Sequence, residues 1–345
     1  MVVRNQTPTA AQKTQIRNTA QIDWDKLKLA HDYSRSFTTS SRVLAIRNGW
    51  IAGEWGDITN YNVASATKSF TGLCFAKLFD LSAAGALSKS IDLQSFAYQY
   101  LPSTWDDADA RKRNIRIEHL MTMSSGLEPD DNPNQPDYLN IVLNQPVRVP
   151  PATEWSYASL PVDLLSIALQ RTAGKTLRAF FNQHIGSPLA IPALTWNTFD
   201  SFSRGATGAS ITPRNLARIG YLMLMNGAWD SGSGQRQVVS SGRISSLRTW
   251  PSFLENVTFR ATPNSPFMVE SGSQLTYGRL WWLNRTGTML GSAVPRNAYY
   301  AHGFKETLLV VVPDRSLVVV RFGPAPTVLP AFRREFMKRV MAAML

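Results

Sequence analysis

Apolar runs typical of β-strands lie near the two ends of this chain, and the long stretch between them is mostly helical in pattern. Near the N-terminus, two runs within 43–55 flank Asn48-Gly49, a pair that favours a tight hairpin because both residues tolerate positive φ. Near the C-terminus, 308–313 and 316–322 flank a short polar turn. The sequence therefore predicts an α+β fold: an antiparallel sheet built from both ends and flanked by helices, with a mostly helical inserted subdomain.

The expected division of the chain follows from this arrangement. Residues 1–20 are polar and predict an N-terminal arm, and 21–345 predict one domain. Within that domain we expect an α/β part at about 21–75 and 205–345, and a helical part at about 76–204. The individual elements expected are helices at 21–37, 65–85, 115–123 and 161–173, a strand at 277–285, and an amphipathic helix at the C-terminal end.

The charge balance bears on the partners. Lys and Arg number 36 against 24 Asp and Glu, which gives a net charge of +12. The basic residues form no long run, and their densest cluster, at 111–116, suits the solvated end of a helix. No zinc-finger, RNP-like or basic-zipper pattern occurs, so we expect no nucleic-acid partner. The positive charge instead favours anionic small molecules or cell-surface polymers.

Three further features limit the classes of protein to be considered. No stretch is long and apolar enough to span a bilayer, and the first residues lack the apolar core of a signal peptide. A cytoplasmic location, or a periplasmic or secreted one after processing, stays open, as does the oligomeric state. The four histidines are scattered without any HExxH pattern, so we expect no metal and no other cofactor. The Walker, GxGxxG and GxSxG patterns are also absent.

One S-x-x-K pattern occurs, at Ser65-Ala66-Thr67-Lys68. The four letters alone are weak evidence, because an N-capping serine followed by a surface lysine looks the same. Their context is more specific, since the strand-like YNVA runs here into a long apolar helix pattern. The helix macrodipole there favours negative charge on Ser65, and Lys68 falls on the same face of the helix. Partial burial among apolar neighbours would lower the pKa of Lys68 toward the range that a general base needs.

At this point the chain resembles a known family. The segment NVASATKSFTGLCFAKL is similar to the nucleophile helix of the class C β-lactamase family, which also contains D-alanyl-D-alanine peptidases, esterases and 6-aminohexanoate-dimer hydrolases. The resemblance extends over about 40–345. It is carried further by IRIEHLMTMSSGL (115–127), by VPPATEWSYASLPVDLLSIALQRTAGK (149–175) and by GASITPRNLARIGYLMLMNGAW (208–229). The resemblance implies Ser65 as nucleophile and Lys68 as its base.

The second motif of that family is Y-x-N, and two segments compete for its place. Tyr157-Ala158-Ser159 has matching surroundings and a helix directly after it, but serine replaces the asparagine. Tyr138-Leu139-Asn140 matches the letters, without those surroundings. We favour Tyr157, which would pass a proton to the leaving group, with Ser159 as a substrate contact. Serine at this place also occurs in the aminohexanoate-dimer branch, which favours esters or linear amides as substrates.

The third motif, K-T-G or a variant, has two possible registers. In the first, Ala301-His302-Gly303 takes its place, and the N–H of Phe304 joins that of Ser65 as the oxyanion hole. In the second, His302 replaces the lysine and Lys305 supplies the N–H. We favour the first, because it keeps the glycine in place. In both, the lysine that would bind a β-lactam carboxylate is missing.

The resemblance thus implies a serine hydrolase that forms an acyl-enzyme on Ser65 and cleaves ester or amide bonds of small or linear substrates. The expected substrate contacts are Ser159, His302, Gly303 and Trp282. Loops at 128–147 and 255–275 are expected to shape the cleft. Two alternatives stay open: a β-lactamase or D-alanyl-D-alanine peptidase, and a non-catalytic protein that binds such ligands.

Overall fold

A computed structural model describes residues 2–129, 136–232, 234–262, 269, 271–324 and 329–345. Parts of the two loops expected to shape the cleft lie outside these residues. The chain forms two compact units. The first consists of Met1–Ala66, Ser210–Met225 and Trp282–Leu345, and the second of Thr67–Ala209 and Asn226–Trp281.

The first unit is built on an antiparallel sheet, in the order β12-β13-β14-β15-β1-β2. Both predicted hairpins are present, and the first turns at Asn48 (φ 52°) and Gly49 (φ 81°). The strands from the two ends of the chain meet where β1 pairs with β15. The bounds are β1 Arg42–Arg47, β2 Trp50–Trp55, β12 Trp282–Leu283, β13 Tyr299–Gly303, β14 Thr307–Val312 and β15 Leu317–Phe322.

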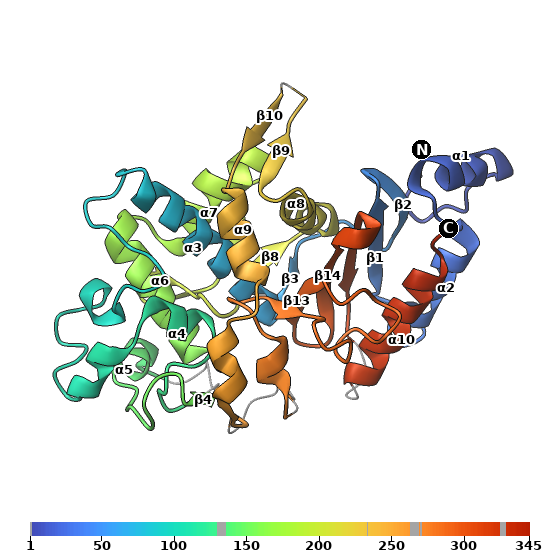
Figure 1. The fold of residues 1–345 in the computed structure, drawn as a ribbon. Coiled ribbons are helices and arrows are strands. Elements are labelled where there is room, and N and C mark those ends of the chain that lie inside the picture. Colours follow the sequence, from blue (N-terminus) through green and yellow to red (C-terminus); the bar gives the residue numbers. More distant parts are fainter. Residues whose placement is uncertain (1, 130–135, 233, 263–268, 270, 325–328) are drawn as a thin grey trace. The chain divides into compact units, whose positions relative to one another are not determined.

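Four helices accompany this sheet: α1 Ala10–Ala20, α2 Trp24–Arg35, α8 Pro213–Leu224 and α10 Leu329–Ala342. α8 packs on β14 and β15 from one side, and α10 lies beside α2 on the other side of the sheet (Figure 1). β14 and β15 are buried along their whole length between these helices. The sheet therefore has two distinct faces, one toward α8 and one toward α10.

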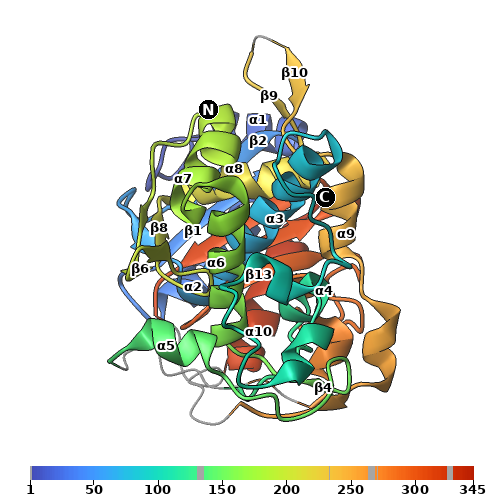
Figure 2. The same cartoon turned by 90° about the vertical axis from the view of Figure 1, so that its left-hand side faces the viewer.

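The second unit is mostly helical. Its helices are α3 Thr67–Ala83, α4 Ile117–Met121, α5 Tyr138–Leu143, α6 Leu160–Ala173, α7 Leu177–Phe181 and α9 Ser241–Arg248, with a π-helical turn at Asn182–Gly186. α6 lies at the centre and contacts α3, α4, α5 and α7 (Figure 2). Eleven of the 14 residues of α6 are buried, because its sequence is apolar on nearly every face. The predicted α+β class, with its helical insertion, is confirmed.

Short elements complete the two units. The strands are β3 Tyr61–Asn62, β4 Glu154–Trp155, β5 Thr195–Trp196, β6 Thr198–Phe199, β7 Phe202–Ser203, β8 Ala209–Ile211, β9 Ala228–Asp230, β10 Gln235–Gln237 and β11 Thr258–Phe259. The 3-10 turns are η1 Ala64–Ala66, η2 Ala97–Tyr100, η3 Ala110–Asn114, η5 Ser187–Leu189, η6 Ser252–Asn256, η7 Ser273–Thr276 and η8 Pro313–Arg315.

Three local features differ from the sequence-based expectations. The predicted arm contains helix α1, which begins with a capping box between Thr9 and Gln12. The helical unit takes in Asn226–Trp281, because α9 packs against α3. The strand expected at 277–285 is reduced to β12, since Leu280 has a φ of 62° and donates its N–H to the Met121 carbonyl.

Candidate active site

Ser65 lies in a tight turn at the start of the nucleophile helix predicted from the sequence. The turn is the 3-10 segment Ala64–Ala66, and α3 follows directly at Thr67. Asn62 accepts the Ala64 N–H through its side chain at 2.8 Å, and the Ala66 N–H donates to the Val63 carbonyl at 3.0 Å. Ala64 has a φ of 46°, which is costly for a residue with a Cβ. Ser65 itself is half-buried, as a nucleophile with access to a substrate would be.

Lys68 is buried inside the helical unit, with only 1% of its surface exposed. Its Nζ donates to Ser159 Oγ at 3.2 Å and to the Ala206 carbonyl at 3.2 Å. The same atom lies 4.9 Å from the centroid of the Tyr157 ring. The structure thus brings together three residues that were predicted from two separate motifs: Lys68, Tyr157 and Ser159.

Tyr157 is held in place by its neighbours in the chain and by the loop after β11. It follows β4 and precedes α6, and its carbonyl accepts a hydrogen bond from Thr262 Oγ1 at 2.5 Å. Its ring packs edge-on against Tyr277, with 5.9 Å between centroids. The side chain is 1% exposed, so its ring is fixed rather than free to rotate in solvent.

A buried polar cluster lies behind Lys68, and sequence reasoning did not find it. Asp163, in α6, is fully buried and accepts hydrogen bonds from the Tyr138 hydroxyl at 2.6 Å and from the Ala206 N–H at 3.0 Å. Arg204 lies 3.9 Å from the same carboxylate. Burial raises the pKa of Asp163, although Arg204, Tyr138, the Ala206 N–H and Lys68 all favour its charged form.

This cluster positions the acceptor that Lys68 uses. The Ala206 backbone donates to Asp163 and accepts from Lys68, so the segment that carries it is fixed on both sides. A Cβ at Gly205 would lie 2.3 Å from the Val162 carbonyl, so only glycine permits this close approach to α6. Tyr138, the competing motif tyrosine, has its hydroxyl engaged by Asp163 here.

The segment predicted to hold the third motif lies on β13, which contacts the 3-10 turn of Ser65. A Cβ at Gly303 would lie 2.1 Å from the carbonyl oxygen of Val63, the residue directly before the turn. Tyr299, two positions from Ala301 on the same face, donates its hydroxyl to the Met223 carbonyl of α8. The face of β13 that carries Tyr299, Ala301 and Gly303 is therefore the one toward η1 and α8.

His302 and Trp282 lie on the opposite face, which is covered by α10. His302 is buried and contacts Glu306 and Arg333, the latter from α10. Trp282 pairs with Tyr300 across β12 and β13 and stacks on its ring at 6.2 Å. Because neighbouring strand residues alternate in direction, these two side chains do not share the face of Gly303. Of the four expected substrate contacts, only Gly303 is on the η1 face of β13, and Ser159 is beside Lys68.

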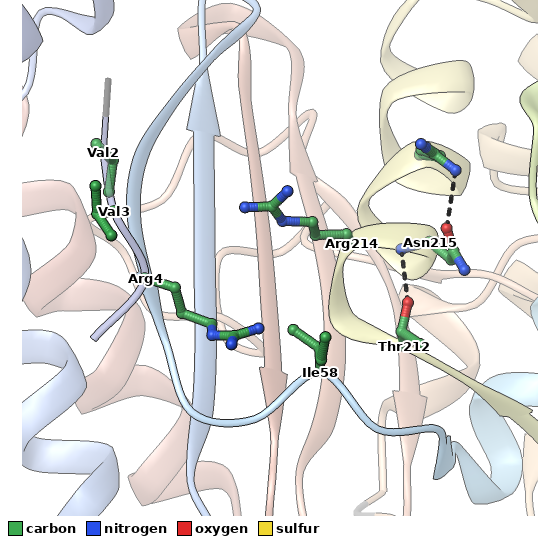
Figure 3. Close-up of a pocket in the computed structure, with 8 residues that line it drawn as sticks. Val2, Val3, Arg4, Ile58, Thr212, Arg214 and Asn215 are labelled. Carbon is green, nitrogen blue, oxygen red and sulfur yellow. Dashed lines mark hydrogen bonds between the residues drawn. The ribbon is translucent and has the colours of Figure 1, made fainter. Parts of the chain in front are cut away.

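One cavity of the first unit lies elsewhere. It has a volume of about 490 Å³ and lies between the N-terminal segment and the start of α8 (Figure 3). Arg4 and Arg214 both extend toward it. None of the predicted site residues lines it. In the described part of the chain, no group of three or more His, Cys, Asp or Glu side chains could hold a metal ion, and no helix is long and apolar enough to cross a membrane.

Comparison with known proteins identifies the fold and the family. The family model for β-lactamases matches residues 39–327. The chain belongs to the β-lactamase family. Members of this family share a serine hydrolase fold, and the predicted nucleophile helix, the predicted tyrosine motif and the strands β13–β15 all fall within the matched region.

Individual relatives of this β-lactamase-family chain are distant. A protein of Bacteroides dorei DSM 17855 assigned as a β-lactamase superposes with a TM-score of 0.69 at 15% identity, covering 88% of this chain and 91% of that one. A protein of Bacillus anthracis assigned as a 6-aminohexanoate-dimer hydrolase superposes with a TM-score of 0.66 at 16% identity, covering 88% and 79%. Protein flp of Staphylococcus aureus (strain MW2) is 22% identical over 203 residues, which are 52% of this chain and 39% of that protein. The chain thus spans well under half of the length of this curated relative.

Proposed function

We propose that this β-lactamase-family protein is a carboxylesterase or amidase that forms an acyl-enzyme on Ser65. The observation that carries the proposal is the environment of Lys68. Lys68 is 1% exposed, is held by Ser159 and the Ala206 carbonyl, and lies against the Tyr157 ring. Burying a lysine costs free energy, and buried titratable groups of this kind are common at functional sites. Lys68 stands three residues after Ser65, on the first turn of α3.

The mechanism proceeds by two acyl transfers. Ser65 Oγ attacks the substrate carbonyl carbon while Lys68, in its neutral form, takes the hydroxyl proton. The N–H groups of Ser65 and Phe304 stabilise the oxyanion. Tyr157 gives its proton to the leaving alcohol or amine and regains one from Lys68. Water then attacks the acyl-enzyme by the same proton transfers in reverse, which releases the acid and restores Ser65.

Esters and linear amides are favoured over β-lactams as substrates. In the favoured register, Ala301 takes the place of the motif lysine that would bind a β-lactam carboxylate, and a methyl group cannot pair with an anion. Ser159 replaces the asparagine of the second motif, and its hydroxyl oxygen accepts a hydrogen bond from Lys68. The structural similarity to the Bacillus anthracis protein assigned as a 6-aminohexanoate-dimer hydrolase, a name that denotes a linear amide, agrees with this preference.

The test compares p-nitrophenyl acetate, p-nitrophenyl butyrate and nitrocefin as substrates for the wild type, Ser65→Ala and Lys68→Met. We expect ester turnover that both variants lose, with little nitrocefin hydrolysis. Ser245→Ala, an exposed serine on α9, is the matched control and should behave as wild type. Full activity in Ser65→Ala would refute the proposal. Strong nitrocefin turnover that Ser65→Ala abolishes would keep the nucleophile and overturn the substrate preference.

A further inference from the structure

The loop between β13 and β14 has an unfavourable backbone conformation. It consists of Phe304, Lys305 and Glu306, and the pair Gly303 and Thr307 closes it. Lys305 has a φ of 59° and Glu306 a φ of 62°. Two consecutive residues with side chains in the left-handed region persist only where the surroundings impose that conformation. Contacts with the rest of the first unit must therefore hold the loop in this conformation.

One part of the restraint acts on the Glu306 side chain. The side chain is fully buried, and its Oε1 lies 3.0 Å from Nε2 of His302 and 3.7 Å from the Arg333 guanidinium. Arg333 also lies 3.0 Å from Nδ1 of His302. Because arginine can only donate, Nδ1 must accept, so the proton of a neutral His302 is on Nε2 and is donated to Glu306. Burial lowers the pKa of His302, which agrees with the neutral form.

A second part of the restraint acts on the loop backbone. Arg321, fully buried on β15, donates to the carbonyls of Lys305 at 2.9 Å and Glu306 at 3.0 Å. Its Nε donates to Ser34 Oγ at 2.9 Å, which ties the guanidinium to α2. Burial lowers the pKa of Arg321 to about 10, so the group stays charged at neutral pH and its hydrogen bonds are charge-assisted.

We infer that Glu306, His302, Arg333 and Arg321 are positioning residues that fix the backbone N–H of Phe304 for oxyanion binding. This inference rests on the proposed function. Phe304 opens the strained loop and directly follows Gly303, which contacts the Val63 carbonyl at the start of the Ser65 turn. The buried cluster holds the other end of the same three-residue loop from the α10 face, so it acts through the backbone and touches no substrate.

Residues of this kind act on the transition state. A misplaced N–H donor stabilises the oxyanion of the transition state less well, and it affects the binding of the substrate much less. For Glu306→Gln and His302→Leu we expect kcat for p-nitrophenyl butyrate to fall about 10- to 100-fold, with KM within about 2-fold. The rate of Ser65 labelling by a fluorophosphonate, and the affinity for a phenylboronic acid, should fall in proportion, because both place an oxygen in the oxyanion hole. His302→Gln, whose amide can still donate to Glu306, should recover most of the loss.

Controls separate this role from a purely structural one. Glu335→Gln removes a carboxylate of α10 that pairs with Arg339 at 2.8 Å, away from the loop, and should leave all these rates unchanged. Glu306→Gln with wild-type kcat and boronic acid affinity would overturn the inference. A variant that has a lower melting temperature but keeps its affinity for boronic acid would also overturn the inference, because its defect would be in stability alone. If Glu306→Gln does not fold, the pair His302→Leu and His302→Gln gives the same comparison.

Failure of the inference differs from failure of the proposed function. Loss of turnover and labelling in Ser65→Ala, together with wild-type behaviour of the Glu306 and His302 variants, would overturn only the positioning role. Turnover and labelling that survive in Ser65→Ala, or that the wild type lacks altogether, would overturn both.

Discussion

The Nζ atom of Lys68 lies 3.2 Å from the Oγ atom of Ser159, so the serine that replaces a motif asparagine still contacts the lysine of the first motif. Together with the hydrogen bond to the Ala206 carbonyl, this contact helps to fix the direction of Nζ. An ordinary hydrogen bond of this kind contributes about 0.5–1.5 kcal/mol, enough to affect turnover up to about tenfold.

Ser159→Ala is therefore expected to lower kcat about 10-fold with p-nitrophenyl butyrate, because it removes the side-chain hydroxyl that accepts a hydrogen bond from Lys68. Ser159→Asn restores the asparagine of the motif and keeps an acceptor oxygen, so it should retain most of the turnover. Steady-state kinetics on both variants test this. Equal activity of Ser159→Ala and wild type would show that the contact does not position Lys68.

The two tyrosines that compete for the second motif are distinguished by a pair of matched substitutions. Tyr157→Phe should lose turnover by about 100-fold or more, because it removes the proposed proton donor. Tyr138→Phe removes the 2.6 Å hydrogen bond to buried Asp163, which should lower the free energy of unfolding by about 1–3 kcal/mol and leave kcat near wild type. Denaturant unfolding and ester kinetics, measured on both variants, give the comparison. The reverse pattern would transfer the motif to Tyr138.

Much of the fold was accessible from the sequence because its signals are local. Asn48-Gly49 specifies a turn by conformational preference alone, and the hairpin forms there. Thr9 and Gln12 carried an equally local signal for α1, a capping box, within the segment expected to be an arm. The reduction of the strand at 277–285 depends instead on a contact of Leu280 with distant Met121, which no local pattern encodes.

The candidate site shows the same division. Lys68, Tyr157 and Ser159 could be assigned because motif letters and their surroundings mark them. Strand alternation could have placed His302 on the face opposite Gly303 once the first register was chosen. The partners of buried charges, by contrast, come from remote segments: Asp163 meets Arg204, and Glu306 meets Arg333 of α10. Only the folded chain brings such pairs together.

The close approach of β13 to the Ser65 turn gives a third prediction. Gly303→Ala would place a Cβ 2.1 Å from the Val63 carbonyl, and a backbone atom cannot move aside cheaply. We expect kcat to fall at least 10-fold and the free energy of unfolding to fall by about 1–3 kcal/mol. Gly242→Ala, on α9 with no atom within 4 Å of the added Cβ, is the matched control and should be neutral or slightly stabilising. Full activity in Gly303→Ala would mean that the turn and the strand need not be in contact for turnover.

The last prediction concerns acid stability and the helical unit. Burial lowers the pKa of His119 to about 4 from the ordinary 6.5, with the nearby charges of Glu118 and Arg116 acting in opposite directions. Its Nδ1 accepts the Arg116 N–H at 3.1 Å, and the Phe253 ring packs edge-on against it, so neither contact favours the protonated ring.

Because the folded pKa of His119 lies below the unfolded one, the unfolded chain binds the proton first, and stability falls as pH drops from 6.5 toward 4. The lowering of the pKa from 6.5 to about 4 corresponds to roughly 3 kcal/mol of stability, which is fully present above pH 6.5 and is lost as the pH falls to 4. His31, His184 and His302 also have lowered pKa values and act in the same direction, so the effect must be measured as a difference between variants.

His119→Asn keeps an acceptor for the Arg116 N–H and cannot be protonated. Urea unfolding between pH 4 and 7.5 should show a flatter decline for this variant than for the wild type. Parallel pH profiles would mean that His119 takes up its proton without disturbing the fold.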